Sequence, residues 1–216
     1  MNKCFLLPLV FGLLWPVALV AEDFQYSQNF EKLEFGDPPD ELFVVEGDFQ
    51  VIAVTDDNKA LKLPAIPLVE NGALFGKSSK GAMTAEVRVK GEKKRRSYPR
   101  FALGVHGISG YRLRVVPAKK QVELVKDEEV VHTAPYTWTT AAWCQMKISV
   151  STDAVGKTVV QGWVWSGSDA VPEKPSITLV SDEAPGQGKA SIWGSPYSGK
   201  DIVYDDLKVV IPEAKK

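Results

Sequence analysis

Short runs of alternating hydrophobic and polar residues occur along most of this chain, and no segment repeats its apolar positions at helical spacing. Such alternation predicts β-strands, because successive side chains of a strand point to opposite faces. Gly, Pro, Asp and Asn separate the runs and indicate tight turns between them. The pattern predicts about fourteen short strands, at Tyr26–Lys32, Leu42–Glu46, Phe49–Thr55, Ala60–Leu63, Ala82–Lys90, Arg100–His106, Tyr111–Val116, Gln121–Lys126, Glu129–Thr133, Trp143–Ser151, Thr158–Trp165, Ser176–Val180, Gly188–Trp193 and Asp201–Ile211.

The number and shortness of these strands predict the fold class, which is all-β with a two-sheet antiparallel sandwich. Its jelly-roll form is what the family resemblance described below implies. No internal repeat and no low-complexity linker divides the sequence. We therefore expect a single β-sandwich domain over residues 22–212. The remaining residues, 213–216, are expected to form a frayed tail.

The last predicted strand places an acidic residue among apolar ones. Alternation puts Val203, Asp205, Leu207 and Val209 on one face of this strand, which we expect to be the face that packs in the core. Removing an isolated charge from water is costly. Asp205 is therefore expected to be ion-paired, hydrogen-bonded or bound to a metal ion.

The first 21 residues have the pattern of a secretory signal peptide. Lys3 is their only charged residue, residues 5–20 are almost entirely apolar, and Ala21 offers a small residue before Glu22. A membrane anchor is the alternative, although the apolar run is close to the short limit for a spanning helix and contains prolines. We expect cleavage after residue 21 and a secreted or periplasmic protein, because no later stretch is apolar enough to span a membrane.

Removing that segment leaves a nearly neutral domain. The whole chain has 26 Lys and Arg against 27 Asp and Glu, and this balance gives no general attraction to nucleic acid. The chain has two cysteines, and Cys4 leaves with the signal, so Cys144 has no partner for an intrachain disulfide. Cys144 alternates with Met146 and Ile148, which indicates a buried, unreactive thiol.

Several stretches carry a likeness to a known family. They are Val159–Trp165 with the Pro-containing loop after it, Gly188–Gly194, Asp201–Val209 with its paired Asp, and more weakly Phe30-Glu31 and Gly47-Asp48-Phe49. Together they resemble the concanavalin A-like lectin/glucanase superfamily, including its laminin-G-like bacterial members. The resemblance covers most of residues 24–211 and implies the sandwich fold, while its short motifs do not imply a particular activity.

The resemblance also implies a structural calcium ion. In many such sandwiches an early acidic residue and an Asp of the last strand help to hold the ion, and here these would be Glu31 and Asp205. Carboxylate and backbone oxygens are the ligands that calcium requires. The alternative is that Asp205 accepts hydrogen bonds from backbone N–H groups of a neighbouring turn, and the sequence leaves both possibilities open.

No acid pair for glycoside hydrolysis is evident in the sequence. Glucanases of this superfamily carry Glu-x-Asp-x-x-Glu along one strand, and hydrolysis requires two carboxylates placed across one bond. The nearest stretch is Glu46-Gly47-Asp48, but Val51 occupies the last position of the motif and Gly47 indicates a turn. The other acidic clusters, Asp127–Glu129 and Asp182-Glu183, fall in predicted hairpin turns. We therefore assign no catalytic residue.

One group of candidate ligand-binding residues lies around a predicted hairpin. If residues 107–110 form its turn, His106, Arg112 and Arg114 share one face of the sheet. Arginine and histidine on such a face could bind an anionic or hydroxylated ligand. The alternative, which we favour for these three residues, is an ordinary polar outer face.

Tryptophan residues form a second group of candidates. Trp163 and Trp165 are two residues apart and lie on one side of their strand, and Trp143 points away from Cys144. Indole rings stack on sugar rings, so Trp143 and Trp163 are our candidates for stacking on a glycan. The alternative is that the Trp163 side faces the other sheet, since large aromatic residues of a sandwich usually lie in the core.

Residues 92–100 form the one dense basic run of the sequence, between two predicted strands. A protruding loop of this kind could bind a sulfated or uronic polysaccharide or an anionic surface. The alternative is a solvated loop tip, which is the more common role for such a run.

The family resemblance, taken with the lack of an evident acid pair, implies a secreted, noncatalytic, carbohydrate-binding protein that recognises a polysaccharide or glycan through the open face of one sheet. We expect it to act as a monomer, without nucleic acid and without a membrane span after signal cleavage. A hydrolase or lyase of the same fold that acts on polysaccharide is the first alternative. A structural or adhesive envelope protein is the second.

Overall fold

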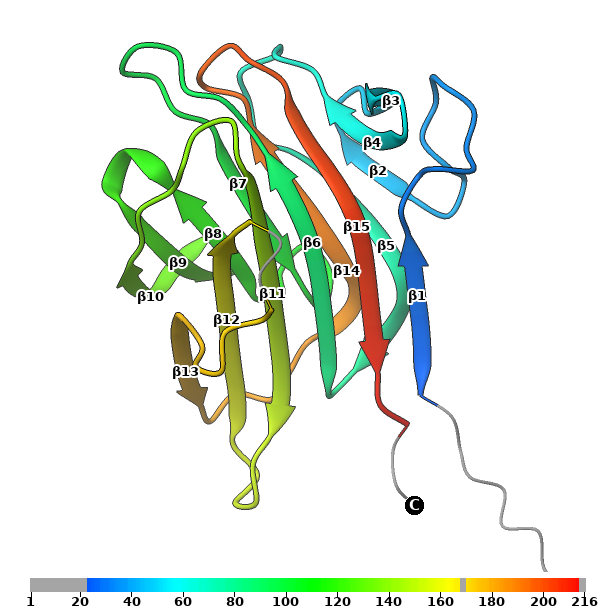
Figure 1. Cartoon of the computed structure of the whole chain (residues 1–216). Helices are drawn as coiled ribbons and strands as arrows, with labels where there is room; N and C mark the ends of the chain where they lie inside the picture. The colour runs from blue at the N-terminus through cyan, green and yellow to red at the C-terminus, as the bar shows by residue number, and fades with distance from the viewer. Residues whose placement is uncertain (1–22, 168–169, 214–216) are drawn as a thin grey trace, which may run out of the picture.

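The computed structural model describes residues 23–167 and 170–213, which form two antiparallel β-sheets packed face to face (Figure 1). Within these residues there is no α-helix, and a 3-10 turn covers Pro117–Lys119. The predicted all-β, two-sheet antiparallel sandwich is therefore confirmed. The predicted signal peptide at residues 1–21 and most of the predicted tail lie outside the described residues.

Eight strands form the sheet that is nearer the viewer in Figure 1, which we call sheet A. Strand β15 lies near its centre and pairs with β6 on one side. On its other side β15 pairs with β4 along its first half and with β1 along its second half. The strands are, in order across the sheet, β13 (Ile177–Ser181), β12 (Thr158–Ser166), β11 (Trp143–Thr152), β6 (Met83–Lys90), β15 (Ile202–Ile211), β4 (Asn58–Leu63) and β3 (Gln50–Thr55), with β1 (Phe24–Gln28) also beside β15.

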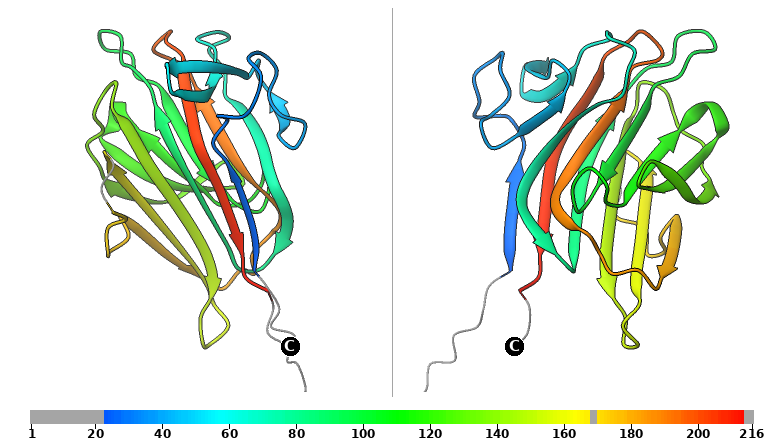
Figure 2. Two further views of the ribbon diagram at one scale, coloured as in Figure 1. Left: turned by 45° about the vertical axis from the view of Figure 1, so that its right-hand side comes forward. Right: turned by 180° about the vertical axis from the view of Figure 1, so that it is seen from behind.

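Seven strands form the second sheet, sheet B, which the rear view in Figure 2 brings forward. The strands are, in order, β10 (Glu129–Pro135), β9 (Gln121–Lys126), β8 (Arg112–Val116), β7 (Arg100–Gly104), β14 (Gln187–Ser195), β5 (Asn71–Lys80) and β2 (Phe43–Glu46). Both ends of the described chain lie at one end of the sandwich, and the loops β4–β5, β6–β7 and β14–β15 lie at the other (Figure 1).

The core lies between the two sheets and follows the alternation seen in the sequence. In β11, Cys144, Met146 and Ile148 are buried among the core side chains, while the residues between them point outward. Burying one such aliphatic side chain contributes about 1.5–3 kcal/mol to folding. Burial raises the pKa of the Cys144 thiol to about 12, so this cysteine is a core residue with little thiolate at neutral pH, as the sequence predicts.

Strand β5 is the element that the sequence does not predict. Asn71 and Gly72 indicate a turn, but they begin a ten-residue strand that is hydrogen-bonded to β14. The indole ring of Trp193 lies directly over Gly72, and a Cβ at this position would be 2.4 Å from a ring carbon. The glycine therefore permits a close approach of a side chain from the neighbouring strand rather than a change of chain direction.

The first predicted strand ends earlier than expected, at Gln28 rather than at residue 32. Phe30 has a φ of 62°, which lies in the left-handed region and is incompatible with a continuous strand. Its side chain is fully buried in the core, so packing of the ring holds the backbone in this conformation.

A β-bulge in β15 changes the predicted faces of the last strand. Asp205 is opposite Arg88 and Lys208 is opposite Glu86, so two residues of β15 face a single residue of β6. Asp206 has a φ of 50° at this point, and the alternation of faces shifts by one residue. The prediction that Val203 and Asp205 share the core face with Leu207 and Val209 is therefore wrong: only the latter two pack in the core.

Candidate functional site

The outward side chains of β12, β11, β6 and β15 form a surface on sheet A that we call the tryptophan face. Antiparallel pairing places these side chains in rows that cross the strands. The tryptophan rings of this face are half-buried on the open side of the sheet. The structure therefore favours the solvent-facing alternative for Trp163 over the core alternative. The rows are Trp165, Gln145, Arg88 and Asp205; Trp163, Lys147, Glu86 and Lys208; and Trp143, Lys90 and Val203.

Cationic side chains lie beside the rings of the tryptophan face. The guanidinium carbon of Arg88 is 4.5 Å from the centre of the Trp143 ring, and the Lys147 ammonium is 5.7 Å from the centre of the Trp163 ring. Cation–π attraction of this kind contributes about 0.5–1 kcal/mol at exposed sites. Lys147 also forms an ion pair of 3.0 Å with Glu86. These contacts hold the rings in place and surround them with charge.

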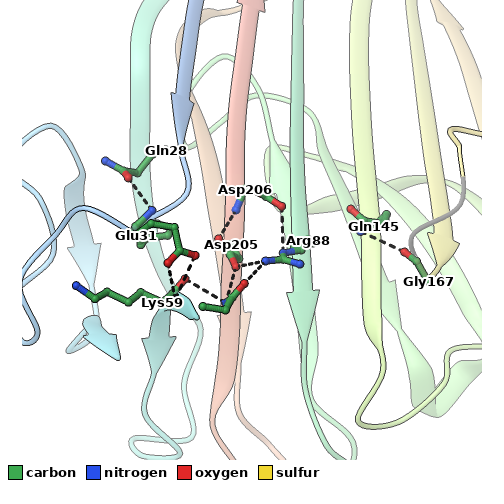
Figure 3. A network of polar contacts seen from close by, with 10 residues as sticks. Gln28, Glu31, Lys59, Arg88, Gln145, Gly167, Asp205 and Asp206 are labelled. Atoms are coloured by element: carbon green, nitrogen blue, oxygen red, sulfur yellow. Dashed lines mark hydrogen bonds and ion pairs between the residues drawn. The ribbon is translucent and has the colours of Figure 1, made fainter. Parts of the chain in front are cut away.

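Asp205 lies at the centre of a polar network on the same face (Figure 3). One of its carboxylate oxygens accepts hydrogen bonds from the Arg88 guanidinium at 2.5 Å and from the Asn58 amide at 3.1 Å. The other accepts the backbone N–H of Asp206 at 2.7 Å. Arg88 also contacts the Asp206 carboxylate at 3.1 Å, so the guanidinium lies between two carboxylates. The bulge brings these two acidic residues to one cation.

Burial changes the ionisation of the Asp205 carboxylate. The side chain of Asp205 is 1% exposed. Burial raises the pKa of Asp205 above its usual value, and the hydrogen bonds and positive charge of Arg88 and the amide of Asn58 oppose part of that rise. The ionised carboxylate therefore depends on Arg88 for its stability in the folded protein.

The arrangement around Glu31 and Asp205 does not fit the calcium ion that the sequence resemblance implies. Both oxygens of Glu31 accept the backbone N–H of Lys59 at 3.2 Å, and both oxygens of Asp205 accept N–H donors. A cation at this place would have to displace Arg88. No group of three or more acidic, histidine or cysteine side chains suited to a metal occurs in the part of the chain that the structure describes. A calcium ion bound in another way stays a prediction.

A melting experiment tests calcium at this place. We expect any difference in melting midpoint between EDTA and calcium chloride to be the same in the unaltered protein and in the Asp205→Asn variant, because hydrogen-bond donors already occupy the Glu31 and Asp205 carboxylates. A ligand that binds the native state alone raises the midpoint. A lower midpoint in EDTA that the Asp205→Asn variant no longer shows would establish a calcium site here and contradict this reading.

The predicted group of His106, Arg112 and Arg114 lies on the other side of the molecule. Arg112 points outward from sheet B, but its side chain is only 3% exposed. Its guanidinium pairs with Glu70 at 3.0 Å and with Glu128 at 2.7 Å, and it stacks over the Trp193 ring at 3.8 Å. Arg112 thus joins two loops to the sheet and has little surface left for a ligand.

The other two members of that group also have protein partners. Arg114 donates two hydrogen bonds, at 2.8 and 2.6 Å, to the buried carboxylate of Glu123. His106 is 3% exposed, its Nε2 lies 2.8 Å from the carbonyl oxygen of Gly81, and burial lowers its pKa. The structure therefore does not bring the five predicted ligand-binding residues together: Trp143 and Trp163 lie on sheet A, and the basic three lie on the side of sheet B.

The structure adds residues to the candidate site that the sequence analysis does not single out. Arg88, Gln145 and Lys147 lie in the same rows as the tryptophan rings. Their outward direction follows from the alternation in β6 and β11, which was available in the sequence. Which strands lie next to each other could not be predicted from the sequence, because the pairing of β6 with both β11 and β15 joins segments that are far apart in the chain.

No family model matches the chain, and no curated protein matches it in sequence. Solved structures do match it. The carbohydrate-binding module CBM66 from Bacillus subtilis is 14% identical, with a TM-score of 0.54 over 78% of this chain and 94% of that chain. A lectin from Bauhinia forficata in complex with GalNAc is 7% identical, with a TM-score of 0.54 over 90% and 100%. The alginate lyase Aly36B is 8% identical, with a TM-score of 0.56 over 89% and 98%.

The chain has a jelly-roll sandwich fold. Identities this low show the fold and not the activity. The matched structures include proteins that bind carbohydrate and proteins that cleave it, so the arrangement of side chains has to decide between these functions. Among the described residues, no helix is long and apolar enough to cross a membrane.

Proposed function

We propose that this protein is a secreted, noncatalytic carbohydrate-binding protein of the concanavalin A-like superfamily, laminin-G-like in type, that acts as a monomer and binds a polysaccharide on the tryptophan face. The observation that carries the proposal is the pair of half-buried rings of Trp143 and Trp163 on the open side of sheet A. An indole ring presents a flat apolar surface to the C–H groups of a sugar at a low cost in conformational entropy.

The polar residues of the tryptophan face support the same function. Gln145 lies between the Trp165 and Arg88 positions; its amide nitrogen donates to the Gly167 carbonyl oxygen at 3.2 Å, and its amide oxygen is an acceptor for a ligand. Lys147 and Glu86 offer charged groups in the next row. Sugar hydroxyl groups both donate and accept hydrogen bonds, so an amide and ionised groups beside an aromatic ring suit them. The ligand class that this surface favours is a chain of hydroxylated rings.

The ion pairs on the tryptophan face favour binding over catalysis. A hydrolase needs one carboxylic acid that donates a proton and one carboxylate that acts on the sugar. Here Asp205 and Asp206 share Arg88, and Glu86 pairs with Lys147. Neither a histidine nor a tyrosine is among the residues that define the face, and Lys147, which could act as a base, is ion-paired with Glu86. The enzyme alternative therefore has less support from the described side chains.

Affinity electrophoresis tests this proposal. The protein is run through native gels that contain a panel of soluble polysaccharides, and its migration is compared with that in a gel without polysaccharide. We expect retardation on at least one polysaccharide and no new reducing or unsaturated ends after long incubation. Retardation on none of them would contradict glycan binding, and release of new ends would favour the enzyme alternative.

A further inference from the structure

The basic run found in the sequence forms an ordered turn at the end of the sandwich. It lies in the loop between β6 and β7, away from both ends of the described chain (Figure 1). Lys94 and Ser97 exchange two backbone hydrogen bonds of 3.0 Å each, and Arg95 has a φ of 57° between them. Arg95 and Arg96 are thus presented at the tip of a hydrogen-bonded turn, which lowers the entropy lost when they bind a ligand.

The charges of this turn are not neutralised by the protein. The side chains of Lys93, Lys94, Arg95 and Arg96 are exposed. None of these four takes part in the ion pairs formed among the described residues, whereas the Arg and Lys residues of the two sheets repeatedly do. Glu92 is the acidic residue of the loop, and it lines a different hollow. The turn therefore presents concentrated positive charge.

A hollow of about 580 Å³ lies between this turn and the loop from β14 to β15. Lys94, Arg95 and Arg96 line one side of it, and Tyr197 and Ser198 line the other. Tyr197 is exposed, and the Arg100 guanidinium lies 5.3 Å from the centre of its ring. The hydroxyl of Ser198 is buried without a hydrogen-bond partner among the described residues. The hollow thus combines cations, an aromatic ring and an unused hydroxyl.

Strand β6 connects the tryptophan face to the loop that lines this hollow. Lys90 lies in the row of Trp143, at the end of β6, and the basic loop begins at the next residue. Lys90 and Val203 also line a second hollow, of about 360 Å³, in which Lys200 adds a positive charge and Glu92 and Asp201 add negative charges. One polysaccharide chain could therefore run from the tryptophan rings past Lys90 to the basic turn.

We infer that the basic turn and the β14–β15 loop form a subsite for the anionic groups of an acidic polysaccharide. Arg95 and Arg96 suit this role because a guanidinium donates parallel hydrogen bonds to a carboxylate or a sulfate. Tyr197 supplies a ring against which the sugar that carries the anion can pack. The inference rests on the proposed function, because it assigns a preferred substrate class to the same glycan-binding protein.

Charge removal at the turn tests the inference. The variant Lys94→Ser/Arg95→Asn/Arg96→Ser is compared with Lys32→Ser/Lys157→Ser/Lys174→Ser, which removes the same charge at exposed positions elsewhere. The probes are dextran sulfate, polygalacturonate and neutral dextran. We expect the turn variant to lose on the order of tenfold in affinity for at least one of the two polyanions at low ionic strength, and the control to keep it. The polyanion affected identifies sulfate or carboxylate as the preferred group.

Equal losses in both triple variants, no loss in the turn variant, or no binding of either polyanion by the unaltered protein would overturn the inference. Binding to vesicles of phosphatidylserine and phosphatidylcholine that depends on the turn, without binding to the polyanions, would instead identify a membrane surface. Polyanion binding that depends on the turn but survives loss of Trp143 and Trp163 would leave the anion subsite in place while contradicting glycan binding on the tryptophan face.

Discussion

Replacing Arg88 by leucine is expected to lower the free energy of unfolding by about 3–5 kcal/mol. Arg88 is the cation nearest to the fully buried Asp205, at 2.5 Å, and it also holds the Asp206 carboxylate of the bulge. Its removal leaves a buried carboxylate with only the Asn58 amide and a backbone N–H as donors. Urea denaturation measures the loss directly, and circular dichroism confirms that the variant folds.

The pH dependence of this loss follows from the pKa of Asp205. Burial already raises it in the folded protein, and removing Arg88 removes the charge and hydrogen bonds that oppose the rise. An acid whose pKa is raised by folding binds more protons in the native state, so stability falls as the pH rises from its unfolded pKa through its folded pKa. We therefore expect the Arg88→Leu defect to be smaller near pH 4 than at neutral pH.

A matched control separates the buried ion pair from ion pairs in general. Lys147→Leu removes a cation from the same face, but its partner Glu86 is partly exposed and can be solvated. Partly exposed ion pairs contribute about 0–1 kcal/mol to stability, so Lys147→Leu is expected to lower the free energy of unfolding only slightly. If Arg88→Leu costs no more than Lys147→Leu, or if its cost does not change with pH, Asp205 does not depend on Arg88.

Replacing both Trp143 and Trp163 by alanine is expected to lower the affinity for a retained polysaccharide on the order of 100-fold. Truncating an aromatic residue at the centre of a binding surface costs about 2 kcal/mol, or roughly 30-fold, and two such effects at one site add incompletely. Both rings are half-buried on the outer face and outside the core cluster, so the fold is expected to survive. Affinity electrophoresis in gels of graded polysaccharide concentration gives the dissociation constants.

Phe43→Ala is the control for this experiment. Phe43 is an aromatic residue of sheet B, and 62% of it is exposed. The control therefore removes exposed aromatic surface from another part of the molecule, and we expect it to leave the affinity unchanged. Equal affinity of the double tryptophan variant and the unaltered protein would place the glycan elsewhere. Trp163→Phe, which keeps a ring at the same position, is expected to retain part of the affinity.

Much of the fold follows from local alternation. The alternation around Cys144 correctly gives the buried and outward faces of β11, and the same reasoning places Trp143 on the outer face. The turn residues separate most of the strands at the right places. These features depend on a strand and its own two faces, which a single sequence contains.

Features that depend on neighbouring strands were not predictable in this way. Gly72 is required because the Trp193 ring, from a strand far along the chain, lies over it. The sequence alone therefore predicts a turn at the place where β5 begins. The bulge at Asp206 forms where β15 pairs with β6, and it reverses the predicted direction of Asp205. The separation of Arg112 from Trp143 depends on which strands enter which sheet, and no local pattern reports that.

Nuclear magnetic resonance of isotope-labelled protein during titration with a retained polysaccharide tests the site of glycan binding most directly. The indole N–H signals are assigned with single tryptophan variants. We expect the signals of Trp143 and Trp163 to shift on binding, while that of Trp193, which is buried on sheet B and bonded to Ser191, stays in place. A shift of Trp193 without shifts of Trp143 and Trp163 would contradict binding on the tryptophan face.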